Sequence, residues 1–482
     1  MAYLKGTEWE IVEEGFHLQK SECSESIFSL ANEHLGVRGY FDEGGSLPTT
    51  RGCYVGHVYE ELDIPAYIRY RGVVGKSQYI ATVADLFCLS LSAAGETLDL
   101  GVSKYANFIR KLDIHTGCMV RIFTWKTEAM GDVELRFERL LEMDDPRFAH
   151  QKLTLTTQNA GVLTLQWGIN ATVGSTFDLV SRWIETGRTQ DELLLCTADK
   201  ERQIRYRLYA ADGESQNADR YLGRRYRLTL QTGQTVRVER VVGVTCCDTA
   251  KDTPPPLPEN VLSFSEALQA NRQHYQCFWA QEDITIAGNL SDQQGIRFGL
   301  FQLHQTYRGQ DTRHNIGAKG LSGDVYNGAA FWDTETFCLP YYLLCKPEAA
   351  KKLLLFRYQT LAQAKERAHA LDLEGACFPV ATVNGEEANY LWQHASLQLQ
   401  PSMAVAYGIE RYTQATGDTA FLYREGVEML LEICRYLAFR GAYSAKESSF
   451  GFYGVMGADE FHLMVHNNAF LNVWGKYIFV TL

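Results

Sequence analysis

Residues 249–260 read "TAKDTPPPLPEN" and divide the chain into two parts with different sequence patterns. The three consecutive prolines cannot donate the hydrogen bonds of a sheet ladder and cannot continue a helix, so this stretch is predicted to be a linker. Before it, apolar and polar residues alternate; after it, apolar residues recur every three or four positions. The pattern therefore predicts a change from strands to helices at this point.

The part before the linker has the pattern of half-buried antiparallel strands. Residues 226–244, "YRLTLQTGQTVRVERVVGV", alternate apolar and polar side chains on both sides of a Thr-Gly turn, and residues 162–173 and 202–213 behave similarly. Gly, Asn and Asp bound these runs, as they do in antiparallel sheets. Many such strands in succession predict a β-sandwich, to which we assign residues 1–248.

The part after the linker has the pattern of packed helices. Ser263, followed three residues later by Glu266, forms a capping-box arrangement, so residues 249–290 are predicted to be a Pro-rich linker and a connecting helix. Residues 291–482 are predicted to form a helical domain, which makes the fold α+β and multidomain. The helical segments expected there are 291–307, 332–345, 347–370, 396–415 and 418–440, with Thr416-Gly417-Asp418 ending one helix and capping the next.

Composition disfavours several classes of function. The chain has 482 residues, 46% hydrophobic and 12% aromatic, which supports buried cores and argues against disorder. The net charge of −12 is spread along the chain and disfavours nucleic-acid and membrane partners, which attract basic surfaces. No secretory signal is visible, and the 12 cysteines are scattered without a C-x-x-C pair, so a cytoplasmic protein with free thiols is expected.

Residues 455–470, "VMGADEFHLMVHNNAF", gather acidic, imidazole and amide side chains behind a Gly-Ala turn. On a helix the neighbours Asp459 and Glu460 would point about 100° apart, so one could be an acid catalyst while the other binds substrate or supports the structure. Burial among Phe461, Met464 and Phe470 would raise the pKa of a carboxyl group, as an acid catalyst that works near neutral pH needs. The alternative is an acidic first turn of a helix, and the motif alone does not decide between the two.

Other motifs give weaker signals. His462 and His466 have the spacing of a metalloprotease zinc site, but Leu463 stands where those enzymes have glutamate, so hydrogen-bonding roles are favoured and no metal site is predicted. The Gly-rich stretch 317–323 lacks the order of a nucleotide-binding loop. A G-x-S-x-G nucleophile motif is absent from the sequence.

Residues 331–344, "FWDTETFCLPYYLL", place the ring of Trp332 beside the carboxylate of Asp333. Sugars are held in this way, with C–H faces on an aromatic ring and hydroxyl groups on charged acceptors. The structural alternative is a buried helix start with Asp333 as its cap and Glu335 in its first turn, and this motif alone favours that alternative.

A long polar segment, residues 378–401, connects two predicted helices with "FPVATVNGEEANYLWQHASLQLQP". Loops of this length are usually functional or disordered, and its aromatic and amide side chains favour order. Its candidate substrate-binding residues are Glu387, Trp392, Gln393 and His394.

Four segments, in this order, resemble glycoside hydrolase family 65, the family of maltose, kojibiose, trehalose and related disaccharide phosphorylases. The resemblance covers essentially the whole chain and implies an N-terminal β-sandwich, a helical linker and an (α/α)6 barrel, in agreement with the change of pattern at the prolines. Ala458 stands where the family usually has proline, and His466 and Leu471 alter its Asn-rich run. The resembling segments are 25–44, 319–340, 415–440 and 455–472.

By this resemblance Glu460 is the general acid that protonates the leaving glycosidic oxygen, Trp332 and Asp333 hold the glucose ring, and Asp459 is a further substrate-binding residue. An inverting hydrolase needs a second carboxylate to activate water, whereas phosphate takes that place in a phosphorylase. The implied partners are therefore a small α-glucoside and inorganic phosphate as co-substrate, with no other cofactor and β-glucose 1-phosphate as product. Residues 384–401 are most similar to the glucosylglycerol phosphorylase branch.

Family members extend well beyond Leu482, so the resemblance implies an incomplete barrel without the segment that binds phosphate or carries a hydrolytic base. Half a ring of helices leaves apolar faces exposed, and we expect such a chain to be weakly active or inactive. The alternatives are a trehalase-type α-glucoside hydrolase and a non-catalytic carbohydrate-binding remnant. The resemblance also implies a homodimer.

Overall fold

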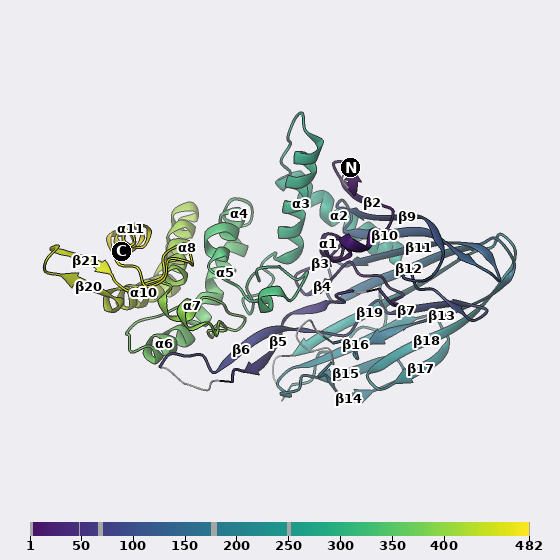
Figure 1. Ribbon diagram of the computed structural model, residues 1–482, viewed down its shortest axis with the longest axis horizontal. Helices are drawn as coiled ribbons and strands as arrows, with labels where there is room; N and C mark the ends of the chain where they lie inside the picture. The colour runs from purple at the N-terminus through teal and green to yellow at the C-terminus, as the bar shows by residue number, and fades with distance from the viewer. Residues whose placement is uncertain (1–2, 48, 66–70, 175–180, 248–251, 482) are drawn as a thin grey trace. The chain divides into compact units, whose positions relative to one another are not determined.

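The computed structural model describes residues 3–47, 49–65, 71–174, 181–247 and 252–481 (Figure 1). The chain folds into two compact units, and each unit is assembled from more than one stretch of the sequence. The domain boundaries placed at residues 248 and 290 stay a prediction. Unit 1 comprises Met1–Val58, Ala81–Thr306 and Leu321–Asp324, and unit 2 comprises Tyr59–Ile80, Tyr307–Gly320 and Val325–Leu482.

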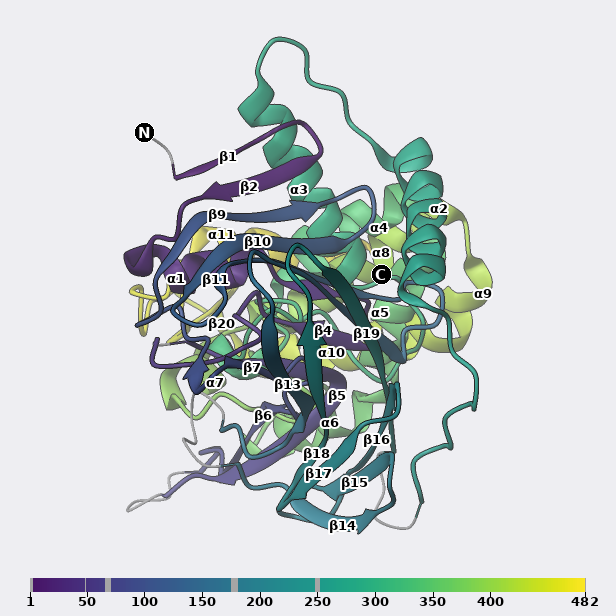
Figure 2. The ribbon, with the colours of Figure 1, turned by 90° about the vertical axis from the view of Figure 1, so that its right-hand side faces the viewer.

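Unit 1 contains a larger and a smaller antiparallel sheet that enclose one apolar core (Figure 2). Phe123 and Leu153 of the larger sheet share this core with Leu91 and Leu165 of the smaller one. Alternating residues point inward because successive side chains of a strand lie on opposite faces. The predicted N-terminal β-sandwich is confirmed.

The larger sheet runs, in spatial order, β1 (Leu4–Gly6), β2 (Glu10–Glu14), β9 (Tyr105–Asp113), β10 (Cys118–Thr127), β11 (Gly131–Leu141), β12 (Phe148–Thr157), β19 (Thr235–Cys247), β16 (Gln203–Ala210), β15 (Glu192–Cys196) and β14 (Ile184–Arg188). The smaller sheet runs β17 (Glu214–Ala218), β18 (Tyr221–Leu230), β13 (Gly161–Asn170), β7 (Leu89–Ala93) and β8 (Glu96–Thr97). A short ladder joins β3 (Leu30–Ala31), β4 (Leu35–Val37) and the start of β5 (Cys53–Asp63). The remaining elements of the first 100 residues are η1 (Leu18–Lys20), α1 (Ser21–Ile27) and β6 (Lys76–Thr82). Most of strand β6 belongs to unit 2.

Buried ion pairs lie inside unit 1. Arg121 on β10 has no exposed side-chain area and donates to Glu43 (Nη1–Oε1 2.6 Å) and to Asp42 (Nη2–Oδ2 3.2 Å). The same guanidinium group lies 4.4 Å from the ring centroids of Phe41 and Phe137. Asp42 and Glu43 belong to the N-terminal segment 25–44, so that segment supplies the counter-charges for an arginine in the core.

The described part of the Pro-rich stretch follows strands β16 and β19. Its carbonyl groups accept hydrogen bonds from Thr245 (Oγ1 to Pro255 O, 2.7 Å) and Tyr209 (OH to Pro258 O, 2.6 Å). Leu257 is buried in a small cluster with the sheet. The stretch is therefore an ordered edge of unit 1 from residue 252 onward.

Helix α2 (Phe264–Glu282) begins as predicted at Ser263. Ser263 Oγ accepts from Glu266 N (3.3 Å) and Glu266 Oε2 accepts from Ser263 N (2.8 Å), which completes the capping box. Helix α3 (Leu290–Thr306), which matches the predicted segment 291–307, also belongs to unit 1.

Unit 2 consists mainly of helices, with the end of β5, most of β6 and one hairpin, and its described helices pack around a large apolar cluster. Helix α8 (Gln400–Thr416) is buried along most of its length, ends at Gly417 (φ 69°), and is followed by Asp418, which accepts from Phe421 N (3.0 Å), as predicted. The other predicted helical segments are confirmed. They form η3 (Thr334–Cys338), α4 (Leu339–Cys345), α5 (Pro347–Gln359), α6 (Leu361–Ala370), α9 (Thr419–Phe421), η4 (Leu422–Gly426) and α10 (Val427–Arg440). Helix α7 (Trp392–Leu397) lies within segment 378–401, which the sequence pattern predicts to be a loop.

The rest of unit 2 includes η2 (Val325–Gly328), the hairpin of β20 (Gly441–Ser444) and β21 (Ser449–Phe452), and the last helix α11 (Ala469–Thr481). All twelve cysteines are free thiols, as expected. Among the described residues, no helix combines the length and the apolar composition that crossing a membrane requires.

Candidate active site

The segment between β21 and α11 is a loop, so the expectation of a helix for the acidic pair is wrong. Val455 and Val465 form an isolated antiparallel bridge that closes the loop (N–O distances 3.1 and 2.9 Å). Met464 (φ 55°) and Asn467 (φ 51°) adopt left-handed backbone conformations, which interrupt a helix. The side-chain directions of a helix therefore do not apply to Asp459 and Glu460.

Glu460 is on the surface of unit 2, with 61% of its side chain exposed. The three residues expected to bury it are exposed as well, Phe461 to 95%, Met464 to 58% and Phe470 to 44%. The expectation of an acid enclosed by apolar side chains is therefore wrong for the described residues, because the loop projects these groups outward.

Helix α7 and the residue that follows it hold the carboxylate of Glu460. Gln398 Nε2 donates to Glu460 Oε1 (3.2 Å), and His394 Nε2 lies 3.5 Å from Glu460 Oε2. Gln398 is 6% exposed, and its amide also contacts Met456 Sδ (3.2 Å), so this donor is held in place. The structure thus brings together His394 and Glu460, two predicted site residues that are far apart in the sequence.

Gln398 and Gln400 are the residues that sequence reasoning missed. Gln400 Nε2, in the first turn of α8, donates to Gly457 O (2.7 Å) and anchors the loop just before Glu460. Both glutamines lie in the quoted segment 378–401, but nothing in the local spacing shows that their partners are about sixty residues away.

The side chain of Asp459 makes its contacts with other residues of the same loop. Asp459 Oδ1 accepts from Phe461 N (3.0 Å), and Oδ2 lies 4.0 Å from His462 Nε2. His466 Nδ1 accepts from Gly454 N (3.0 Å). Because the loop is not helical, the two histidines lack the shared face on which the zinc motif depends.

Trp332 and Asp333 stand at the start of a π-helical turn, η3. Trp332 is half-buried, with its ring 5.9 Å from that of Trp474 on α11 and 6.3 Å from that of Phe337. Asp333 is exposed and makes no side-chain capping bond, so the structural alternative that assigned it a cap is wrong. π-Helical turns often occur at functional sites.

Glu335, the other acid of this motif, has a structural role. It is fully buried and accepts two hydrogen bonds from Arg357 on α5 (2.7 and 3.1 Å). This ion pair fixes η3 against the core of unit 2. In the residues that the structure describes, no hydrogen bond joins Trp332 or Asp333 to Glu460.

The predicted substrate-binding residues of segment 378–401 differ in exposure. Glu387 is 7% exposed and accepts from three backbone N–H groups, of Val380 (2.8 Å), Asn389 (2.9 Å) and Ala381 (3.3 Å). Burial raises the pKa of Glu387, although these donors oppose the effect. Trp392 and Gln393, at the start of α7, are exposed.

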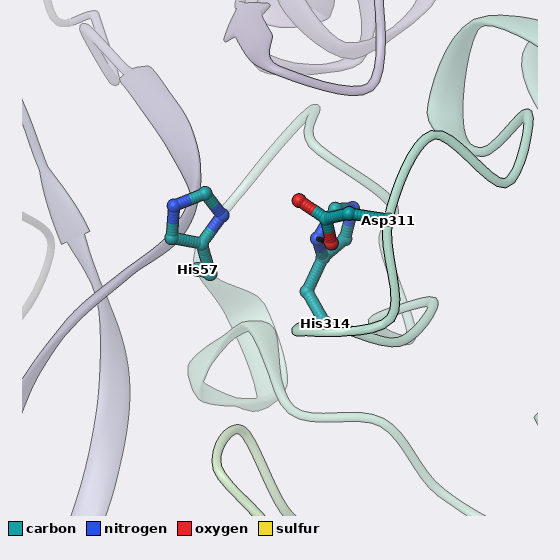
Figure 3. Close-up of side chains that lie close together, drawn as sticks. All are labelled: His57, Asp311 and His314. Atoms are coloured by element: carbon teal, nitrogen blue, oxygen red, sulfur yellow. Dashed lines mark ion pairs between the residues drawn. The ribbon is translucent and has the colours of Figure 1, made fainter. Parts of the chain in front are cut away.

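Another carboxylate–imidazole pair lies in the loop 309–320 of unit 2 (Figure 3). His314 Nδ1 lies 3.1 Å from Asp311 Oδ1, and Arg313 donates to Asp311 through its backbone N (2.9 Å) and Nη2 (2.7 Å). Burial acts to raise the pKa of Asp311, but the donors and charge of His314 and Arg313 hold it well below the usual range. His57, also drawn, belongs to unit 1, where its ring contacts Cys246 Sγ (3.5 Å).

Sequence profiles of one family match both parts of the chain. The profile of the "Glycosyl hydrolase family 65, N-terminal domain" matches residues 11–282, and that of the "Glycosyl hydrolase family 65 central catalytic domain" matches residues 297–481. Every predicted site residue therefore falls within the segment that matches the catalytic domain.

Known proteins with similar sequences and structures agree with these profiles. The chain is 29% identical to the alpha,alpha-trehalose phosphorylase of Thermoanaerobacter brockii (97% of this chain, 65% of that protein) and 29% identical to the maltose phosphorylase of Bacillus subtilis (97% and 64%). A solved structure from the human microbiome, provisionally assigned as a kojibiose phosphorylase, has a TM-score of 0.91 and 36% identity over 99% of this chain and 66% of its own. The chain thus spans 64–66% of the length of these relatives. Both profiles and the shared fold lead to one conclusion: the chain belongs to glycosyl hydrolase family 65.

Proposed function

We propose that this chain carries the sugar-holding and acid-supplying residues of an inverting α-glucoside phosphorylase. The observation that carries the proposal is the match of residues 297–481 to the central catalytic domain of a family whose curated relatives are trehalose, maltose, kojibiose and glucosylglycerol phosphorylases. In this proposal the protein is an enzyme with inorganic phosphate as its second substrate.

Glu460 is proposed as the general acid. Its proton passes to the glycosidic oxygen as the bond from that oxygen to the anomeric carbon breaks, while a phosphate oxygen attacks the anomeric carbon from the opposite face. The products are the acceptor alcohol and β-glucose 1-phosphate, and solvent returns the proton to Glu460. The contacts of its carboxylate with Gln398 Nε2 (3.2 Å) and His394 Nε2 (3.5 Å) support this role, because they hold the acid in one position.

The neighbouring groups are proposed to orient substrate and acid. The ring face of Trp332 is proposed to contact the glucose ring, and the carboxylate of Asp333, which makes no helix-capping hydrogen bond, is proposed to accept from its hydroxyl groups. His394 lies beside the Glu460 carboxylate, and the exposed Trp392 and Gln393 precede it on α7. Glu387 is proposed to act indirectly, since its carboxylate is occupied by backbone donors.

The test is phosphate-dependent release of glucose 1-phosphate by the purified 482-residue chain. Maltose, kojibiose, trehalose and 2-O-α-glucosylglycerol are each supplied with and without phosphate, and the anomer is identified by NMR. We expect a low rate that requires phosphate, gives the β anomer, and falls at least 100-fold in Glu460→Gln. Glu201→Gln, an exposed glutamate of unit 1, is the control and should retain the rate.

Three results would contradict the proposal. Glucose release without phosphate would show a trehalase-type hydrolase, and an α-anomeric product would exclude inversion. Full activity in Glu460→Gln would show that another group supplies the proton.

A second candidate function is carbohydrate binding without turnover. It is favoured by the exposure of Glu460 and Phe461, since an acid catalyst usually works in a site that excludes water. Calorimetry with maltose and with glucosylglycerol tests it. Binding that is lost in Trp332→Ala but unaffected by phosphate, with no product formed, would replace the phosphorylase proposal.

A further inference from the structure

Arg367 is a buried charge on the apolar face of helix α6. It is 8% exposed and shares that face with Leu361, Ala364 and Ala368. Burying an ionised side chain costs free energy unless its donors find partners. In the part of the chain that the structure describes, the guanidinium group of Arg367 forms no ion pair and donates mainly to main-chain oxygen atoms. Directed hydrogen bonds, rather than a neighbouring carboxylate, therefore place this side chain.

The guanidinium group joins two separate segments of unit 2. Nη2 donates to Ala395 O (2.8 Å) and contacts Ser396 Oγ (3.4 Å), both in α7. Nη1 donates to Gly72 O (2.6 Å), in the connection between β5 and β6. Gly72 packs closely on the end of α6, because a Cβ added there would lie 2.3 Å from Leu371 Cδ2. Arg367 thus ties α7 to a segment that is itself fixed on α6.

Helix α7 depends on contacts of this kind because it is short. It has six residues, and its N-cap residue, Leu391, makes no side-chain capping bond. Isolated helices of fewer than about 12–15 residues are marginal in water, so the orientation of α7 depends on groups outside it. Leu397 O accepts from Met456 N (2.9 Å) at the end of the helix. Arg367 holds the helix at Ala395.

The orientation of α7 matters for the candidate acid, because α7 and the residue after it carry the groups that contact Glu460. His394 Nε2 lies 3.5 Å from Glu460 Oε2, and Gln398 Nε2 donates to Glu460 Oε1 (3.2 Å). Ala395 directly follows His394, so a displacement of its carbonyl group also displaces the imidazole. Reacting groups have to be held to within about 0.5 Å of their productive geometry by the residues around them.

We propose that Arg367 is a positioning residue for Glu460: by joining α7 to the connection between β5 and β6, it sets the place of the groups that hold the acid. This inference rests on the proposed function, since it assumes that Glu460 supplies a proton. It assigns the role to the shape of the guanidinium group, because a rigid planar group with several donors can bridge two carbonyl oxygen atoms.

A role of the positive charge alone is the main alternative. Burial raises the pKa of Glu387, and the charge of Arg367 is one of several groups that oppose this effect. A lysine would keep the charge, but its ammonium group on a flexible stem does not reproduce the planar fork. Arg367→Lys therefore separates the charge of the side chain from its shape.

The test compares two α-glucosides that differ in their leaving groups, each supplied with phosphate. The glucoside that the chain cleaves fastest needs a proton on its leaving oxygen, whereas α-glucosyl fluoride loses fluoride as an anion when phosphate attacks the anomeric carbon. Glu460→Gln should lower the rate on the glucoside at least 100-fold and that on the fluoride less than tenfold. Arg367→Lys should show the same selectivity, with a loss of at least about tenfold on the glucoside and less than about threefold on the fluoride. Arg435→Lys, at a side chain that is 59% exposed, should keep both rates.

Leu353→Ala is the control for a loss of stability, because Leu353 is fully buried in the core of unit 2. It should lower both rates by the same factor. Equal losses on the two substrates in Arg367→Lys would show a merely structural role and overturn the proposal. Equal losses in Glu460→Gln would instead refute the proposed function, and with it the premise of this inference.

Two further measurements keep the proposal falsifiable. If Arg367→Lys does not fold, Gly72→Ala displaces the carbonyl group that Arg367 binds and should give the same selective loss; equal losses there overturn the proposal. NMR of histidine rings labelled with ¹⁵N needs no turnover. The ring signals of His394 should shift in Arg367→Lys, whereas those of the exposed His17 of unit 1 should not. Unchanged His394 signals in a folded Arg367→Lys would overturn the proposal even in an inactive chain.

Discussion

The two units differ in the side chains that they bury: unit 2 exposes more large apolar side chains, and unit 1 buries more arginines. Among the described residues, six large hydrophobic side chains of unit 1 are exposed, against twenty-one of unit 2, although unit 2 is the shorter. Unit 1, in contrast, buries four arginines almost completely, Arg110, Arg121, Arg139 and Arg240, whereas unit 2 buries Arg357 to the same degree.

The difference follows from how each unit encloses its core. Two sheets packed face to face cover each other, so unit 1 buries even charged residues when they have hydrogen-bond partners. Carboxylates pair with Arg110 and Arg121, whereas Arg240 donates to Gln151 Oε1 and to backbone carbonyl oxygens. A layer of helices covers only the faces that it turns inward, and apolar surface left in water forgoes about 25 cal/mol per Å². The two sheets of unit 1 therefore cover its core, whereas unit 2 exposes apolar side chains, which is typical of a binding surface.

The largest expected effect is in the buried charges of unit 1. Arg121→Met leaves the carboxylates of Asp42 and Glu43 buried without their partner, and should lower the free energy of unfolding of unit 1 by about 3–5 kcal/mol. Urea titration followed by hydrogen exchange of unit 1 peptides measures it. Arg136→Met on β11, whose side chain is 41% exposed, is the control and should cost less than about 1 kcal/mol. Equal losses of stability in the two variants would show that burial does not increase the contribution of an ion pair in unit 1.

A smaller effect is expected where unit 2 holds the loop that carries Glu460. Gln400→Leu removes the donor to the buried carbonyl of Gly457 and should cost about 1–3 kcal/mol, with faster hydrogen exchange in residues 455–465. Gln393→Leu, an exposed glutamine in the first turn of α7, should change stability by less than about 0.5 kcal/mol. Unchanged exchange in Gln400→Leu would show that the loop is held elsewhere.

The third expected effect is that the stability of unit 2 depends on pH. The pKa of Asp311 is lower in the folded protein than the value of about 3.9 expected in the unfolded chain, so its carboxylate stabilises unit 2 fully above about pH 4. This contribution is lost as the pH falls further, because the unfolded chain takes up the proton first. Asp311→Asn should thus be less stable than wild type at pH 7, by a difference that shrinks toward pH 3.

Urea unfolding of unit 2 at several pH values measures this difference. His314→Gln removes a group that contacts the same carboxylate and should reduce the same pH-dependent contribution. A difference that grows on acidification would contradict the assignment.

The smallest effect is expected at the most exposed aromatic residue. Phe461→Ser should change the free energy of unfolding by less than about 0.5 kcal/mol, because the side chain is 95% exposed and packs against little. Denaturant unfolding measures the change, and binding of an apolar dye to unit 2 should decrease. A loss of more than about 1 kcal/mol would show that the folded protein covers this residue and would weaken the contrast between the units.

Local patterns predicted the elements and several of their ends. The capping box at Ser263 and the helix end at Gly417 depend on residues three or four positions apart, which a sequence shows directly. The same approach failed for residues 455–468, where a bridge joins Val455 to Val465 and the backbone is left-handed at Met464 and Asn467, because a helical spacing of side chains does not show such a loop. It also failed for Gln398, whose partner Glu460 is distant in the sequence.

By itself, the sequence determined the order of a strand-rich part and a helix-rich part, because periods of two and of three to four residues are local properties of the backbone. It also carried the family resemblance, from which the role of Glu460 as an acid is a prediction. Only the tertiary structure decided that Glu460 is exposed beside Gln398 and His394, that Glu387 is held by backbone donors, and that Arg121 is buried with Asp42 and Glu43. Burial and pairing depend on residues that folding brings together from distant positions, and one-dimensional spacing carries no information about them.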